Sequence, residues 1–155
     1  MIIVDGALQV VSKKDLKGYI SYKTPSNITK LGGRGSVFNN NELSKVVITG
    51  NVNEIAPFAF NHCKDLKTII IEDGVKVIDQ YAFSGCIGLE KIVLPASIEK
   101  IGRYAFSSRS SALKIYLPRS VAKVVIASIS EGLREKFCED RLVINDMPKL
   151  DIQGL

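Results

Sequence analysis

The sequence is poor in histidine and cysteine, and this scarcity restricts the chemistry that it can support. Its 155 residues include one histidine and three cysteines. An odd number of cysteines without a characteristic spacing does not indicate a disulfide framework. His62 lies beside Cys63, but one residue of each type does not make up the ligand set of a zinc site. We therefore predict no metal and no cofactor.

Long apolar segments are also missing. The longest apolar runs are about four residues, far shorter than a membrane-spanning helix requires. We therefore expect no membrane insertion. Residues 1–6 lack a basic segment followed by a long apolar stretch, so no signal peptide is predicted. A full-length chain would then be cytoplasmic, whereas a fragment of a longer precursor would be expected at the cell surface or outside the cell.

Concentrated positive charge is a third absence. The net charge is +5, from 21 basic and 16 acidic residues. The densest basic cluster, Lys13, Lys14 and Lys17, is interrupted by Asp15. Nucleic-acid binding usually requires a basic stripe with stacking aromatic residues, so it is not favoured. Residues 32–35, Gly-Gly-Arg-Gly, lack the spacing and the lysine of a phosphate-binding loop and are interpreted as an insertion.

What the sequence does contain is a motif that recurs every 23 residues. An Ala-Phe pair occupies positions 59–60, 82–83 and 105–106, and leucine occupies positions 43, 66 and 89. A repeat this short corresponds to one coil of a solenoid, in which neighbouring coils bury a continuous core. Cys63 and Cys86 share one repeat position and are expected to be buried free thiols, although a disulfide between them is geometrically conceivable.

Each coil carries an alternating pattern typical of a short strand with one buried face. The residues predicted to point into the core are Leu43/Val46/Ile48, Leu66/Ile69/Ile71, Leu89/Ile92/Leu94 and Ala112/Ile115/Leu117. A second extended piece follows, with the apolar pairs Val52/Ile55, Val75/Ile78, Ile98/Ile101 and Val121/Val124. The Ala-Phe region is then expected to begin a short helical turn on the opposite side.

The N-terminal part departs from the repeat and is interpreted as a cap. Asp5-Gly6 lies between two apolar segments and is typical of a tight hairpin turn. This hairpin should cover the open edge of the solenoid. A degenerate first coil follows, with Ile28 and Leu31 in core positions and Val37-Phe38 at its end.

The C-terminal part is interpreted as a second cap. Residues 130–139 predict an amphipathic helix with Leu133 and Phe137 on one face. Residues 141–144 predict a last strand, and the tail from Asp146 is expected to fray. The predicted organisation is an N-terminal hairpin cap over residues 1–19, repeat coils over 20–126, and a C-terminal cap and tail over 127–155.

The pattern L-x-x-I-x-L-P-x-x-[IV]-x-x-I-G-x-x-A-F-x-x-C-x-x-L resembles the BspA-type leucine-rich repeats of bacteria and some protists. The resemblance covers about residues 20–125, and residues 5–8 resemble the lead-in of that family. It implies a right-handed leucine-rich-repeat solenoid with a role in adhesion or protein binding. It transfers no catalytic residue, because the shared motif has none. His62 and Asp65 lie near Cys63, but Cys63 is a core position, so we predict no enzymatic activity.

Residues between the buried positions of each strand must point outward. This predicts an apolar ladder of Val47, Ile70, Val93 and Tyr116. Beside it, a second ladder contains Lys45, Thr68, Lys91 and Lys114. An exposed apolar stripe is typical of a contact surface, although β-branched residues are also simply favoured in strands. Because stacked lysines repel one another, we predict that these eight residues bind an acidic surface on another protein.

Two alternatives remain open. The apolar ladder could be a self-association face that produces a homodimer. Alternatively, Phe58, Tyr81 and Tyr104 form a ladder just before the Ala-Phe pair that could stack on a sugar or a base. Packing over the edge of the coil is the favoured interpretation of these three aromatic residues.

Overall fold

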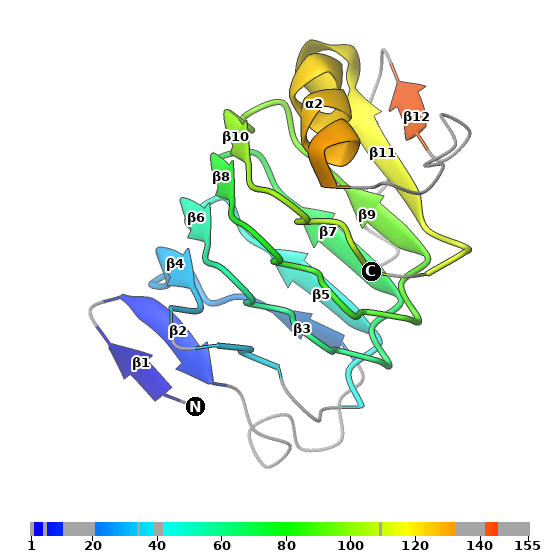
Figure 1. The fold of residues 1–155 in the computed structure, drawn as a ribbon. Helices are drawn as coiled ribbons and strands as arrows, with labels where there is room; N and C mark the ends of the chain where they lie inside the picture. The colour runs from blue at the N-terminus through cyan, green and yellow to red at the C-terminus, as the bar shows by residue number, and fades with distance from the viewer. Residues whose placement is uncertain are drawn as a thin grey trace.

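The computed structural model describes residues 2–4, 6–10, 21–33, 35–38, 42–108, 110–132 and 142–145. These residues form a solenoid, and the strands of its stacked coils make up two six-stranded sheets (Figure 1). The strand order is β1-β2-β4-β6-β8-β10 in sheet A and β12-β11-β9-β7-β5-β3 in sheet B. From β3 to β11 the chain alternates between the sheets, so neighbouring strands come from successive coils. The predicted leucine-rich-repeat solenoid is confirmed.

Sheet B contains the strands that the alternating pattern predicts. All its pairings are parallel, and Val46 lies opposite Ile69, which lies opposite Ile92. The register follows from the constant coil length, which brings the same repeat position into each rung. The strands are β3 (Ser21–Lys23), β5 (Lys45–Ile48), β7 (Thr68–Ile71), β9 (Lys91–Val93), β11 (Lys114–Pro118) and β12 (Leu142–Asn145).

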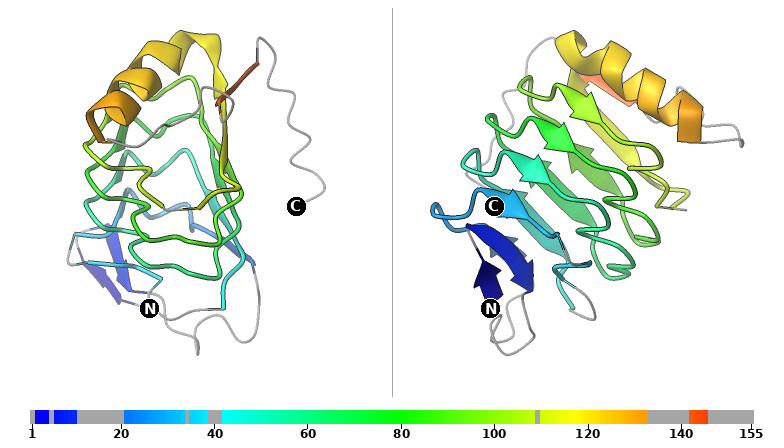
Figure 2. Two further views of the ribbon diagram at one scale, coloured as in Figure 1. Left: turned by 45° about the vertical axis from the view of Figure 1, so that its right-hand side comes forward. Right: turned by 60° about the vertical axis from the view of Figure 1, so that its left-hand side comes forward.

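Sheet A contains the second extended piece of each coil. Its parallel strands are β4 (Lys30–Leu31), β6 (Glu54–Ile55), β8 (Val77–Ile78) and β10 (Lys100–Ile101). The expected hairpin is the antiparallel pair β1 (Ile2–Val4) and β2 (Ala7–Val10), and Gly6 in its turn has a φ of 74°. Because β2 pairs with β4, the hairpin extends sheet A at its N-terminal end (Figure 2).

The core between the sheets is a stack of equivalent side chains. Phe38, Phe60, Phe83 and Phe106 stack ring on ring, with successive centroids 5.1, 5.2 and 5.9 Å apart. All the predicted inward positions of the strands in sheet B are buried except Ala112. Ile28 and Leu31 are buried too, so the degenerate first coil is confirmed.

The prediction that Ala112 is a core residue is wrong: Ala112 is exposed, and Leu113 is buried in its place. Ser108 and Ser110 precede it and are buried polar residues where the earlier coils have a cysteine segment. The Ser110 hydroxyl donates a hydrogen bond to the carbonyl of Leu89 (2.5 Å). Along this altered path, alternation places Leu113 on the same face as Ile115, and the larger side chain fills the core.

The Ala-Phe region forms single turns rather than the expected helical turn. The N–H groups of Ala59, Asn61 and Cys63 close such turns by bonding three residues back along the chain. The intervening N–H groups bond to the next coil instead, from Phe58 to Gln80, from Phe60 to Ala82 and from His62 to Ser84. Phe58 and His62 have positive φ angles of 61° and 58°, which are incompatible with a continuing α-helix. Bonding between coils therefore replaces the helical pattern.

The C-terminal helix begins earlier than predicted. After a 3₁₀ turn, η1 (Arg119–Val121), helix α2 (Ala122–Gly132) follows at once, so Val121 and Val124 do not form a strand. Val121 and Val125 are buried one helical turn apart, and α2 lies across the end of the coil stack (Figure 2). Strand β12 confirms the predicted last strand from Leu142 to Ile144. Leu133, Phe137, Arg141 and the tail from Asp146 lie outside the described residues. No described helix has the length and apolar character that membrane crossing requires.

Candidate interaction face

The eight predicted contact residues lie in two neighbouring rows on the outer face of sheet B. The parallel register places Lys45 opposite Thr68, Thr68 opposite Lys91, and Lys91 opposite Lys114; we call these four residues the lysine column. Two residues further along each strand is the outer strip, which consists of Val47, Ile70, Val93 and Tyr116. The outer strip forms an apolar cluster separate from the interior core.

The outer strip is much less exposed than the sequence suggested. The exposed fractions of Val47, Ile70 and Val93 are 8%, 5% and 7%, and Tyr116 is partly buried. Among the described residues, no helix or strand lies over this face (Figure 2). The expectation of an open apolar stripe is therefore wrong, because the three aliphatic side chains offer little free surface.

The lysine column carries the accessible charge of this face. Lys114 is exposed, and Lys45 and Lys91 are partly exposed. The ion pairs formed within the described ranges involve other lysines: Lys23–Glu72, Lys30–Glu54, Lys67–Glu90 and Lys76–Glu99. The Lys91 ammonium lies 4.9 Å from the ring centroid of Tyr116, an attractive cation–π arrangement. The column thus presents positive charge beside an aromatic ring.

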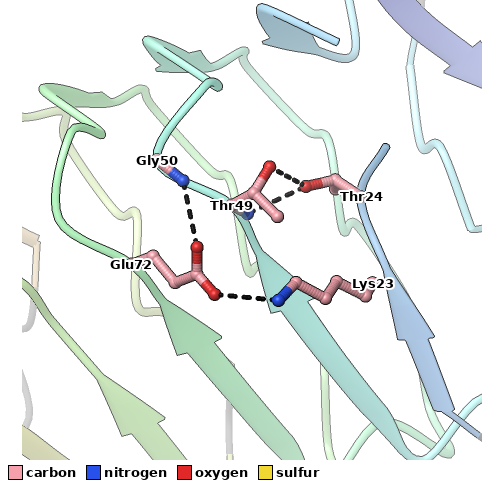
Figure 3. A network of polar contacts seen from close by, with 5 residues as sticks. All are labelled: Lys23, Thr24, Thr49, Gly50 and Glu72. Atoms are coloured by element: carbon pink, nitrogen blue, oxygen red, sulfur yellow. Dashed lines mark hydrogen bonds and ion pairs between the residues drawn. The ribbon is translucent and has the colours of Figure 1, made fainter. Parts of the chain in front are cut away.

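Glu72 is an acidic residue near the same face, but its charge is already matched. One carboxylate oxygen accepts a hydrogen bond from the N–H of Gly50 (3.3 Å), and the other lies 3.3 Å from the ammonium of Lys23 (Figure 3). At the ends of the neighbouring strands β3 and β5, the Thr24 hydroxyl oxygen accepts a hydrogen bond from the N–H of Thr49 (2.8 Å). Glu72 therefore helps to fix the strand ends and does not neutralise the lysine column.

The aromatic ladder before the Ala-Phe pairs is a stack. Phe58 and Tyr81 have parallel rings with centroids 5.1 Å apart, and Tyr81 and Tyr104 have the same separation. The guanidinium of Arg103 lies 5.6 Å from the ring centroid of Tyr104. A sugar or a base stacks on a free ring face, whereas most faces here are occupied by neighbouring rings. The geometry favours packing between coils over ligand stacking.

The cysteines of the repeat are buried and free. The thiol of Cys86 donates a hydrogen bond to the carbonyl of Phe60 (2.9 Å), and that of Cys63 points to the carbonyl of Phe38 (3.6 Å). The neighbouring Cys63 side chain, together with burial, raises the pKa of the Cys86 thiol. His62 is exposed whereas Cys63 is buried, so they do not form a nucleophile–base pair. Within the described part of the chain, no three His, Cys, Asp or Glu residues are placed to hold a metal ion.

We expect Cys63 and Cys86 to be unreactive in the native protein, because the reactive species is the thiolate and both thiols are buried. In a Cys138→Ser background, a disulfide reagent such as DTNB at neutral pH should modify them at least about 100-fold more slowly than in denaturant, since reaction requires opening of the coil. The denatured protein is the control and should release two equivalents of chromophore. Rapid modification under native conditions would contradict the burial of these thiols.

Comparisons with known proteins agree with this architecture. Residues 34–131 match a family model described as the BspA type leucine rich repeat region, in six copies. A crystal structure of a leucine-rich repeat protein from Bacteroides ovatus superposes with a TM-score of 0.51 at 25% sequence identity. The matched region covers 65% of this chain and 30% of that protein. No match was found among curated proteins.

Proposed function

Because the chain belongs to the BspA-type leucine-rich repeat family, we propose that it is a non-enzymatic interaction module that binds an acidic surface of another protein. Repeat solenoids present long surfaces of regular spacing, which suit protein binding. The contact residues are those of the lysine column, with Tyr116 beside them. The observation that carries the proposal is that Lys45, Lys91 and Lys114 lie on one face without an ion pair among the described residues.

The spacing of these lysines supports an acidic partner. Adjacent strands in a sheet are about 4.8 Å apart, so Lys91 and Lys114 on neighbouring strands repel each other. Carboxylates placed over the column would reduce this repulsion and steer the encounter of the two proteins. The outer strip contributes little apolar area, because Val47, Ile70 and Val93 are buried. Charge and the Tyr116 ring must therefore provide most of the recognition.

The two alternative functions receive less support from the geometry. A homodimer through the outer strip would need free apolar surface, and three of the four side chains are less than a tenth exposed. Sugar or base stacking on Phe58, Tyr81 and Tyr104 would need open ring faces, which are mostly covered by the neighbouring rings.

Charge reversal of the lysine column tests the proposal. The triple variant Lys45→Glu/Lys91→Glu/Lys114→Glu should bind immobilised poly-L-glutamate roughly 10- to 100-fold more weakly than the wild type at low salt, because each exposed charge contributes a fraction of a kcal/mol and reversal doubles its effect. Surface plasmon resonance over a salt series measures the change.

The matched control reverses three lysines elsewhere, in Lys76→Glu/Lys100→Glu/Lys123→Glu. It has the same net charge as the triple variant, but its substitutions lie on the sheet A side and on α2. We expect it to retain most of the binding. Equal losses in both variants would show that net charge alone determines binding, and the proposed face would then have to be abandoned.

A further inference from the structure

One lysine of the lysine column differs from the others because an aromatic ring lies beside it. In the parallel register of sheet B, the diagonal neighbour of a column residue is the outer-strip residue of the next strand. That neighbour is Ile70 for Lys45, but it is Tyr116 for Lys91. Diagonal neighbours are about 8 Å apart at the usual strand spacing and rise, which a lysine side chain can span. Isoleucine has no ring, whereas the face of a tyrosine ring attracts an ammonium group.

The contact between Lys91 and Tyr116 is formed in the structure. The Lys91 ammonium lies 4.9 Å from the centroid of the Tyr116 ring. The ring is held in place, because Tyr116 is partly buried and packs against the cluster of Val47, Ile70 and Val93. An ammonium group has three hydrogen-bond donors, and a ring face covers one side of it. Lys91 is partly exposed, so its other donors remain accessible to a partner.

We propose that Tyr116 is a positioning residue that holds Lys91 as the anchor of the lysine column, the lysine that contributes most to binding an acidic partner. This inference rests on the proposed function. A mobile lysine side chain loses conformational freedom when it pairs with a carboxylate, and this loss reduces its contribution to affinity. Because the ring already restricts Lys91 in the free protein, less freedom remains to be lost on binding.

Exposure alone predicts a different order among the lysines. Lys114 is exposed, whereas Lys91 is only partly exposed, so Lys114 would be expected to make the stronger contact. In the described part of the chain, the cations that lie over aromatic rings are Lys91 and Arg103. Lys45 and Lys114 therefore have neither an ion pair nor a ring among the described residues to hold them. If preorganisation matters more than exposure, Lys91 is the strongest of the three.

The contact is tested first in the absence of a partner, by NMR. The ring current shields protons above a ring face, so the methylene protons next to the Lys91 ammonium should resonate upfield of those of Lys45. They should return to the usual position in Tyr116→Leu and stay upfield in Tyr116→Phe, which keeps a ring. An unchanged Lys91 resonance in Tyr116→Leu overturns the proposal, because the ring would then not hold the side chain.

A double-mutant cycle then measures binding to immobilised poly-L-glutamate at low salt. Lys91→Met should weaken binding about 5- to 20-fold, against about 2- to 5-fold for Lys45→Met or Lys114→Met. Tyr116→Leu should weaken binding about 2- to 10-fold. This loss should disappear when Lys91 is already methionine, since Tyr116 acts through Lys91.

Tyr104→Leu is the matched control. It also removes a tyrosine ring with a cation beside it, the guanidinium of Arg103, 5.6 Å from the ring centroid. Tyr104 follows β10 of sheet A and lies outside the strands that carry the lysine column. We expect this variant to bind poly-L-glutamate like the wild type. A loss as large as that of Tyr116→Leu would overturn the proposal, because removal of any such ring would then weaken binding.

The cycle separates the positioning role from the proposed function. Equal losses from Tyr116→Leu with and without Lys91 overturn positioning, because the ring would then contact the partner directly. Tighter binding by Tyr116→Leu also overturns it, since the ring would then withhold Lys91 from the partner. If the wild type itself does not bind, the proposed function fails and the anchoring role fails with it, whereas the NMR shift still reports the contact between Lys91 and Tyr116.

Discussion

Replacing Phe60 with alanine should lower the free energy of unfolding by about 3–5 kcal/mol, as expected when a buried aromatic side chain is removed from a close-packed core. Phe60 is fully buried and stacks on two other rings, with centroids 5.1 Å from Phe38 and 5.2 Å from Phe83. Both neighbouring coils therefore lose a contact at once. The hydrogen bond from the Phe60 N–H to the carbonyl of Ala82 (2.8 Å) fixes the spacing of the two coils at this point, which limits how far they can move to fill the cavity.

Urea denaturation followed by circular dichroism measures this loss, and Phe58→Ala is the matched control. Phe58 lies two residues away and has the same side chain, but it is 38% exposed and, among the described residues, stacks on one ring, that of Tyr81. We expect its replacement to cost about 1 kcal/mol, the value of one aromatic pair together with partial burial. Comparable losses in the two variants would contradict the view that the phenylalanine stack holds the coils together.

The 23-residue period was sufficient to predict most of the core. Once the coil length is constant, equivalent residues must lie opposite one another, and this determined that Ile69 would lie between Val46 and Ile92. The prediction failed at Ala112, where Ser108 and Ser110 alter the path of the chain and Leu113 enters the core instead. A strict period does not detect a local change in the path of the backbone, because it assigns residues to core positions by their number in the repeat and takes no account of the space in the core.

The candidate site was predicted in position but not in exposure. Strand alternation was enough to place Ile70 and Val93 on the outer face. It could not show that they are almost fully buried, since exposure depends on segments far away in the sequence. The single turns of the Ala-Phe region were missed for a related reason. The positive φ of Phe58, Tyr81 and Tyr104 is rare for aromatic residues. At Phe58 and Tyr81 the N–H group bonds to a carbonyl of the next coil, which one coil alone does not reveal.

Close approach of the backbone between coils makes Gly74 the second position with a large expected effect. Gly74 has a φ of 118°, which side-chain-bearing residues rarely adopt. A Cβ atom there would also collide with the backbone of Gly50 in the preceding coil, 2.9 Å from its Cα atom and closer still to its carbonyl oxygen. The Gly74 N–H donates to the hydroxyl of Ser97 (2.9 Å), which in turn donates to the carbonyl of Val75 (2.7 Å). The glycine is thus held from both neighbouring coils.

Gly74→Ala should therefore destabilise the protein by about 3–5 kcal/mol, since backbone strain of about 1–3 kcal/mol combines with displacement of one coil from the next. Gly35→Ala is the control that separates these two terms. Gly35 has nearly the same φ, 120°, but a Cβ atom there would meet nothing within 4 Å. It should show the strain alone, about 1–3 kcal/mol, in the same urea titration. If the two variants lose equal stability, the contact between Gly50 and Gly74 contributes nothing, and the spacing of the coils must be set by the phenylalanine stack and the sheet hydrogen bonds alone.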